Sequence, residues 1–171
     1  MATIVAAILF DYALDRYGSI TVGEGSRRAC EHAVRLAYAH PDSIVFFAAR
    51  ASPDPKWRNI PLGNSARRYM KTIAPDVLTT FREADTFNTF GEILSLARYL
   101  VARRATEHDT VLIAVKWWHA PRVRMLAHGI FAHLKLHCPV TVCPHWFRLT
   151  PKTFAHELGA LPADWSRIRQ I

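Results

Sequence analysis

Five short apolar runs, separated by stretches with helical spacing, constrain the fold of this chain more than any other feature. Continuous apolar runs rich in β-branched residues are typical of strands covered on both faces, as in parallel sheets. The alternation predicts an α/β three-layer sandwich, with a mostly parallel, about five-stranded, Rossmann-like sheet and helices on both faces. The predicted strands cover residues 3–10, 43–49, 76–81, 109–115 and 139–147, and the predicted helices cover 26–40, 65–74, 86–105, 121–136 and 150–161.

The length and cysteine content favour one cytoplasmic domain. The chain has 171 residues, which suits a single domain over residues 1–171. No apolar run approaches the roughly 18 residues that span a bilayer, so no membrane span is predicted. The apolar start lacks a preceding basic segment and a cleavage pattern, so we interpret it as a first strand rather than a signal peptide. Three cysteines are too few, and odd in number, for a disulfide framework.

The charge of the chain favours anionic partners without selecting one. The formal net charge is +8 and the sequence pI is about 9.9. The arginines are scattered in pairs along the chain, and no basic block of the kind that marks a nucleic-acid-binding arm is present. A nucleotide, a phosphosugar, a membrane surface and RNA all fit this charge.

Long or unusual loops follow the predicted strands. Ligands of parallel α/β folds bind beyond the carboxyl ends of the strands, near the point where the strand order reverses. We therefore expect these loops to face one cleft. They cover residues 11–25, 50–63, 82–88 and 115–121.

The loop after the fourth predicted strand reads "WWHAPR" and is the main candidate site. Pro121 suits the first turn of a helix, where backbone N–H groups and the positive end of the dipole attract anions. His119 and Arg122 would add donors and charge for a phosphate, carboxylate or sulfate group. Trp117 and Trp118 would form a wall of the pocket. The alternative is that the tryptophans pack in the core and Arg122 is solvated.

Two other helix starts contribute candidates. Thr89 and Glu92 have the spacing of a capping box, and Asn88 and Thr89 would bind hydroxyl or phosphate groups of a ligand near Glu92. In "GEGSRR", Ser26 is a candidate N-cap after a weak, glycine-containing phosphate turn that is neither GxGxxG nor a Walker loop. Arg27 and Arg28 stand where the helix dipole disfavours cations, which a bound anion would explain. Solvated surface arginines are the alternative.

The histidines and cysteines do not form a metal motif. Cys138 and Cys143 are five residues apart, so on a regular strand they point to opposite faces. Cys143 and His145 share a face, but no group supplies the three or four ligands of a zinc site. We predict no metal and expect Cys30 and Cys138 in the core.

The order of these features resembles the SanA/YdcF/ElyC-like family of bacterial proteins. The resemblance covers roughly residues 3–135 and is most specific at "WHAPR". It implies a Rossmann-like fold with a polar pocket at the strand ends and, from what is suggested for some members, S-adenosylmethionine or a link to cell-wall precursors. Two departures are "FAARAS" in place of glycines after the second strand, and Lys116–Trp117 in place of Thr-Ser before the histidine. The matching residues are Arg27 or Arg28, Met70, Asn88, Thr89, Glu92, His119 and Arg122.

The leading hypothesis is that the chain is a cytoplasmic protein that binds a small anionic or nucleotide-like ligand. The candidate ligands are S-adenosylmethionine, a nucleotide and a phosphosugar. His119 is the candidate catalytic acid or base if the protein is an enzyme, because imidazole titrates near neutral pH. Arg122 and the helix N-terminus would hold the anion, and Trp57 or Trp117 would close over it. The alternatives are a basic nucleic-acid-binding module and a scaffold or interaction protein with a vestigial site.

Overall fold

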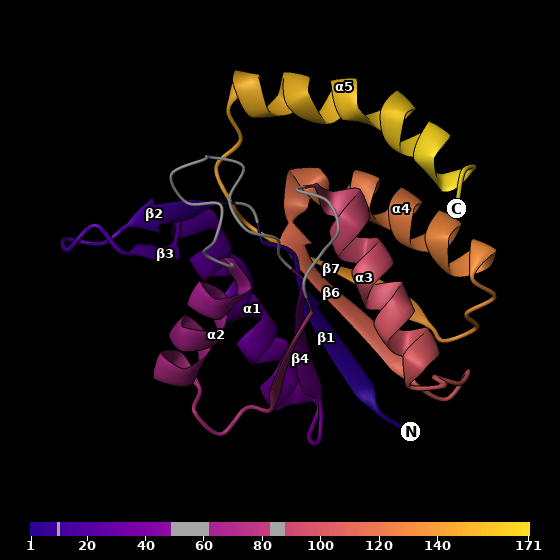
Figure 1. The fold of residues 1–171 in the computed structure, drawn as a ribbon, viewed down its shortest axis with the longest axis horizontal. Coiled ribbons are helices and arrows are strands. Elements are labelled where there is room, and N and C mark those ends of the chain that lie inside the picture. The colour runs from indigo at the N-terminus through magenta and orange to yellow at the C-terminus, as the bar shows by residue number, and fades with distance from the viewer. Residues whose placement is uncertain (10, 49–61, 83–87) are drawn as a thin grey trace.

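The computed structural model describes residues 1–9, 11–48, 62–82 and 88–171. Its centre is a five-stranded sheet in the order β5-β4-β1-β6-β7 (Figure 1). Every neighbouring pair in this sheet is parallel, which confirms the predicted α/β class. The strands are β1 (Thr3–Ala7), β4 (Ile44–Ala48), β5 (Thr79–Arg82), β6 (Thr110–Lys116) and β7 (Val140–His145).

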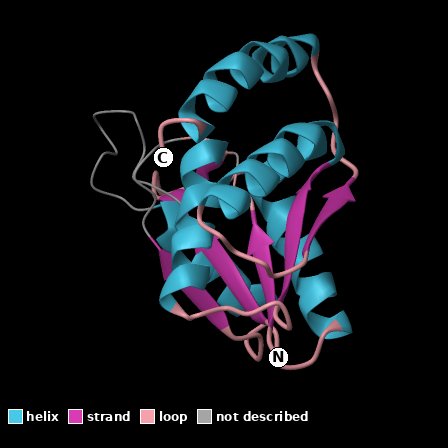
Figure 2. Cartoon of the chain, turned by 90° about the vertical axis from the view of Figure 1, so that its right-hand side faces the viewer, coloured by secondary structure: helices cyan, strands magenta, loops and turns pink. Residues whose placement is uncertain are grey.

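Helices cover both faces of the sheet (Figure 2). Helices α1 and α2 pack on one face, and α3 and α4 pack on the other. The last helix, α5, lies over α4 on the side away from the sheet (Figure 1). The helices are α1 (Glu24–Ala39), α2 (Leu62–Ile73), α3 (Thr89–Ala102), α4 (Ala120–His133) and α5 (Pro151–Ile168).

The apolar strand residues serve two separate cores. Successive side chains of a strand point to opposite faces, so Ile4 and Phe46 pack towards α3 and α4, whereas Val5 and Phe47 pack towards α1 and α2. All four side chains are buried. This explains why the strands read as continuous apolar runs rather than as alternating ones.

The order of the strands reverses between β1 and β6. The chain leaves β1 towards β4 through α1, and it leaves β6 towards β7 through α4. The N-termini of α1 and α4 therefore open at the carboxyl edge of the sheet, on either side of this switch point, where ligands of such folds bind.

Two parts of the chain differ from the prediction. The segment 11–25, expected to be a loop, contains an antiparallel ribbon of β2 (Tyr12–Leu14) and β3 (Ile20–Val22). Strands of three residues are too short for a visible alternation, although Gly18 at φ 76° marks the turn region. The last helix was expected to end at Leu161, before Pro162, but it continues through that proline to Ile168. Most of the predicted loops 50–63 and 82–88 lies outside the described residues.

Candidate anion-binding site

His119 lies directly after β6, in the short 3₁₀ helix Trp117–His119 that leads into α4. Its side chain is buried, with only 1% exposed. Thr89 Oγ1 lies 2.9 Å from its Nε2, and the carboxylate of Glu157 hydrogen-bonds its Nδ1. The imidazole is thus held between the start of α3 and the inner side of α5.

The protonation state of His119 defines the direction of these bonds. Burial lowers the pKa of His119, and the hydrogen bond and charge of Glu157 only partly oppose this. A neutral imidazole donates from one nitrogen and accepts at the other. With the Glu157 carboxylate as acceptor, Nδ1–H donates to Glu157 and Nε2 accepts the hydroxyl proton of Thr89. The result is a hydroxyl–imidazole–carboxylate chain, the arrangement in which a base is oriented by a third group.

Arg122, in the first turn of α4, is also held by α5. Its Nε donates to Asp164 Oδ2 at 2.5 Å, and its Nη1 donates to Glu157 Oε1 at 3.3 Å. Asp164 is fully buried and also accepts from Arg167 Nη1 at 3.2 Å. The carboxylates of α5 therefore occupy the position in which the sequence predicts an external anion beside His119 and Arg122.

Lys116, the last residue of β6, brings a second cation, besides Arg122, to this edge of the sheet. Its side chain is buried, and its Nζ lies 4.2 Å from the centre of the Phe147 ring and 5.3 Å from that of Trp118. Burial lowers the pKa of Lys116, and the nearby carboxylates, Asp11 first among them, oppose this. A Cβ on Gly25 would lie 2.5 Å from Nζ, so the ammonium lies close to the first turn of α1 and would have to move if residue 25 carried a side chain.

The N-terminus of α1 is occupied by a carboxylate of the protein itself. Asp11 Oδ2 accepts from the Gly25 N–H at 3.1 Å, and Oδ1 accepts from the Ser26 N–H at 2.7 Å. The prediction of Ser26 as N-cap is wrong, because the helix begins at Glu24 with Gly23 as N-cap. The hydroxyl of Ser26 instead donates to the backbone oxygen of Asp11 at 2.7 Å.

Arg27 and Arg28 have protein partners of their own. Arg27 Nε donates to the backbone oxygen of Val22 at 3.2 Å, and Arg28 Nη1 pairs with Glu31 Oε2 at 3.2 Å. Both arginines are exposed. These contacts agree with the surface-arginine alternative and explain their position without a bound anion.

The start of α3 also differs from the predicted capping box. The N-cap is Asn88, whose Oδ1 accepts from the Gly91 N–H at 3.0 Å, so the prediction of a Thr89–Glu92 box is wrong. Because Asn88 caps the helix, the hydroxyl of Thr89 is available to contact His119. Glu92 accepts from the Leu9 N–H at 3.1 Å, just beyond the end of β1, and is buried. Burial raises the pKa of Glu92 well above 4.5, against the opposing effects of the Leu9 bond and Arg122.

This raised pKa predicts that ionisation of Glu92 lowers the free energy of unfolding as the pH rises. The folded protein holds the proton more tightly than the unfolded chain, so the free energy of unfolding falls as the pH rises from about 4.5 towards the folded pKa. We expect Glu92→Gln to remove this fall, which makes the variant more stable than wild type at pH 8 and about equal to it at pH 4. Urea unfolding at both pH values measures this. A variant that is less stable at pH 8 would contradict it.

The two tryptophans of the loop have different surroundings. Trp117 is 40% exposed, donates from Nε1 to the Phe147 oxygen at 3.0 Å and stacks on Trp146 with ring centres 5.7 Å apart. Trp118 meets the His119 ring edge-on at 5.7 Å. Trp118 therefore borders His119 directly, while Trp117 joins the loop after β7. Trp57, the other predicted closing residue, lies outside the described residues.

Four residues of the site were not among its predicted members: Asp11, Lys116, Glu157 and Asp164. The signal for the last two was present in "HELGALPAD", because residues seven apart lie on the same face of a helix. Asp11 follows the first predicted strand directly, which is the position from which a side chain can cap the next helix.

The cysteines lie where the sequence places them. Cys30 and Cys138 are buried, and burial raises the pKa of Cys30 to about 12. Within the described residues, no three histidine, cysteine, aspartate or glutamate side chains lie close enough together to hold a metal ion.

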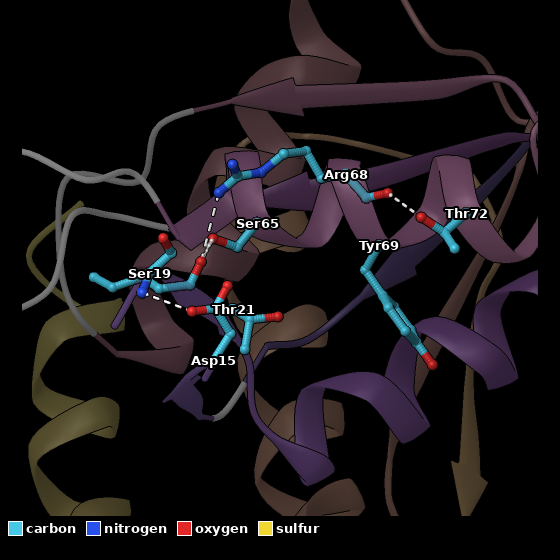
Figure 3. A pocket seen from close by; sticks show the side chains of 8 residues that line it. Asp15, Ser19, Thr21, Ser65, Arg68, Tyr69 and Thr72 are labelled. Atoms are coloured by element: carbon cyan, nitrogen blue, oxygen red, sulfur yellow. Dashed lines mark hydrogen bonds between the residues drawn. The ribbon is translucent and has the colours of Figure 1, made fainter. Parts of the chain in front are cut away.

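A separate polar pocket of about 310 Å³ lies between the β2–β3 ribbon and α2 (Figure 3). Ser65 Oγ and Arg68 Nη2 both donate to the Ile20 oxygen, at 3.0 and 3.5 Å, while Asp15 accepts from the N–H groups of its own turn. Its polar groups are thus largely bonded to one another. The residues that line it are Asp15, Ser19, Ile20, Thr21, Ser65, Arg68, Tyr69 and Thr72.

Comparisons with known proteins add no assignment. No family model matches the sequence, and neither a curated protein nor a solved structure matches it. In the part of the chain that the structure describes, no helix has the length and apolar character needed to cross a membrane.

Proposed function

We propose that this protein binds a small anionic or nucleotide-like ligand at the carboxyl edge of the sheet, beside the switch point between β1 and β6. The observation that carries the proposal is the pairing of His119 and Arg122 with the carboxylate of Glu157. Two cationic or proton-donating groups at one strand-to-helix turn already hold an anionic group there. A ligand anion would replace the carboxylate of Glu157 and leave Asp164 in place.

Each residue has a role that follows from its chemistry. The guanidinium of Arg122 can donate to two oxygens of a phosphate or carboxylate at once. Lys116 supplies a point charge, and the first turn of α4 supplies backbone N–H groups. Glu157 is only partly covered, with 12% of its side chain exposed, whereas Asp164 is fully buried. Glu157 is therefore the carboxylate that an entering ligand displaces at the lower cost.

The Thr89–His119–Glu157 chain supports an acid–base role for His119 in this proposal. An imidazole whose Nδ1–H donates to an anion, Glu157 in the free protein and the ligand anion after displacement, can accept a proton at Nε2, either from Thr89 or from a ligand hydroxyl that takes its place. We therefore propose that the site transfers a proton at His119 Nε2 when it acts on its ligand.

The resemblance to the SanA/YdcF/ElyC-like family supports a nucleotide-like ligand such as S-adenosylmethionine over a simple inorganic anion. The proposed setting is the cytoplasm, where nucleotides and phosphosugars are available. Lys116, which replaces a hydroxyl residue of the family pattern, adds a charge that favours phosphorylated ligands over neutral ones.

Thermal unfolding at fixed salt concentration tests the proposal with inorganic phosphate, pyrophosphate, AMP, glucose 1-phosphate and S-adenosylmethionine. A ligand at about 100 times its dissociation constant adds about 2.7 kcal/mol, which raises the Tm of a domain of this size by several degrees. We expect the shift from the responding ligand to be lost in Lys116→Met and kept in Lys71→Met, which removes an exposed lysine of α2. A shift of equal size in both variants would place binding elsewhere.

A further inference from the structure

Helix α5 carries an apolar stripe that adjoins the face in contact with α4. Phe154, Leu158 and Trp165 are 52%, 54% and 50% exposed, and with the partly buried Leu161 they follow the spacing of one helix face. Single exposed apolar side chains also occur on α1 and α3, at Tyr38 and Val101, but on α5 three of them share one helix face. Within Pro151–Ile168, all of which is described, Asp164 is the one buried residue.

The acidic and basic side chains of this region differ in exposure. The two carboxylates of the helix, Glu157 and Asp164, contact His119 and Arg122 on the inner side. The cations of the same region are exposed, and Arg169 lies with its guanidinium 5.6 Å from the centre of the Trp165 ring. The exposed charged side chains of this region are therefore basic: Arg148, Lys152, Arg167, which also pairs with Asp164, and Arg169.

We propose that α5 docks on an anionic lipid surface through this stripe. A helix with aromatic and leucine side chains on one face, and lysine and arginine beside them, lies in the plane of a membrane interface. Phe154, Leu158 and Trp165 would enter the boundary between head groups and acyl chains. Arg169, whose guanidinium lies over the Trp165 ring, would contact the lipid phosphates. The helix has 18 residues, so it offers a contact about 27 Å long.

Charge favours a lipid surface over a second copy of the chain. A second copy would bring the same basic residues to the contact, and the whole chain has a net charge of +8. The composition of the stripe also argues against nucleic acid, because Leu158 and Leu161 have no flat face on which a base could stack. An anionic membrane matches both the apolar stripe and the cations.

Co-sedimentation of the full chain with lipid vesicles tests this proposal. We expect binding to vesicles of equal parts phosphatidylcholine and phosphatidylglycerol, weaker binding at high salt, and little binding to phosphatidylcholine alone. The triple variant Phe154→Asn/Leu158→Asn/Trp165→Gln should lower vesicle affinity by at least about tenfold. The matched control is Leu78→Asn, which changes a 62% exposed leucine outside α5 and should leave vesicle affinity unchanged.

The variants keep the inner carboxylates of α5, so thermal unfolding of each one verifies that the fold is retained. Vesicle binding that is lost in the folded triple variant and kept in Leu78→Asn supports the proposal. Equal binding of the triple variant and wild type would overturn it. The absence of binding to anionic vesicles would also overturn the proposal if wild type instead formed a dimer that the triple variant lacks. The same holds if wild type instead bound a single-stranded oligonucleotide that the triple variant does not bind.

Discussion

Replacing Arg122 with methionine should lower the free energy of unfolding by about 3–5 kcal/mol. Arg122 is buried and bonded to both Asp164 and Glu157. Its removal leaves the fully buried carboxylate of Asp164 without this partner, and a buried charge that loses its counter-charge costs more than the pair itself contributes. The fall in Tm should be about 6–20 °C for a domain of this size. Urea unfolding monitored by circular dichroism measures the change.

The matched control is Arg124→Met, which removes an exposed arginine two residues further along α4. We expect it to change the unfolding free energy by less than about 0.5 kcal/mol. The double variant Arg122→Met/Asp164→Leu should regain most of the loss, because it removes the stranded carboxylate as well. If Arg122→Met and Arg124→Met had equal stability, the ion pairs beneath α5 would not hold that helix in place.

Neutralising Glu157 should have the largest effect on binding. Glu157→Gln removes the negative charge that binds His119 and Arg122, and it keeps the shape of the side chain. A hydrogen bond to a charged group contributes about 1.5–3 kcal/mol, so its loss should tighten pyrophosphate binding by about tenfold to a hundredfold. The same change should reduce the stability of the ligand-free protein, since His119 and Arg122 lose an ionised partner. Isothermal titration calorimetry with pyrophosphate measures the affinity.

The control for Glu157→Gln is Glu107→Gln, which removes an exposed carboxylate in the turn before β6. It makes the same change in net charge at a site that does not contact His119 or Arg122. A similar gain in affinity in both variants would show a general charge effect and not competition at His119 and Arg122. A loss of affinity in Glu157→Gln alone would mean that the carboxylate helps to build the ligand site.

The sheet and the position of His119 followed from the sequence because local patterns encode them. Continuous apolar runs indicate strands buried on both faces, and the structure has these strands in one parallel sheet. Pro121 marked the start of α4, which places His119 and Arg122 at the carboxyl edge of the sheet. Each of these inferences needs only neighbouring residues.

The partners of these residues did not follow from the sequence, because tertiary packing selects them. Glu157 is 38 residues from His119, and Asp164 is 42 residues from Arg122. The helix caps show the same limit. Ser26 has a good capping side chain, but Asp11, 15 residues earlier, supplies acceptors to the N-terminus of α1 from another segment.

The most direct test of the anion site is the ¹⁵N chemical shift of the His119 ring nitrogens during a pyrophosphate titration. The resonances can be assigned by comparison with a His119→Gln spectrum. We predict that both ring nitrogens of His119 shift with a saturating dependence on pyrophosphate, while those of the exposed His108 do not. Calorimetric binding of pyrophosphate with no change at His119 would contradict the account and place the anion elsewhere on the protein.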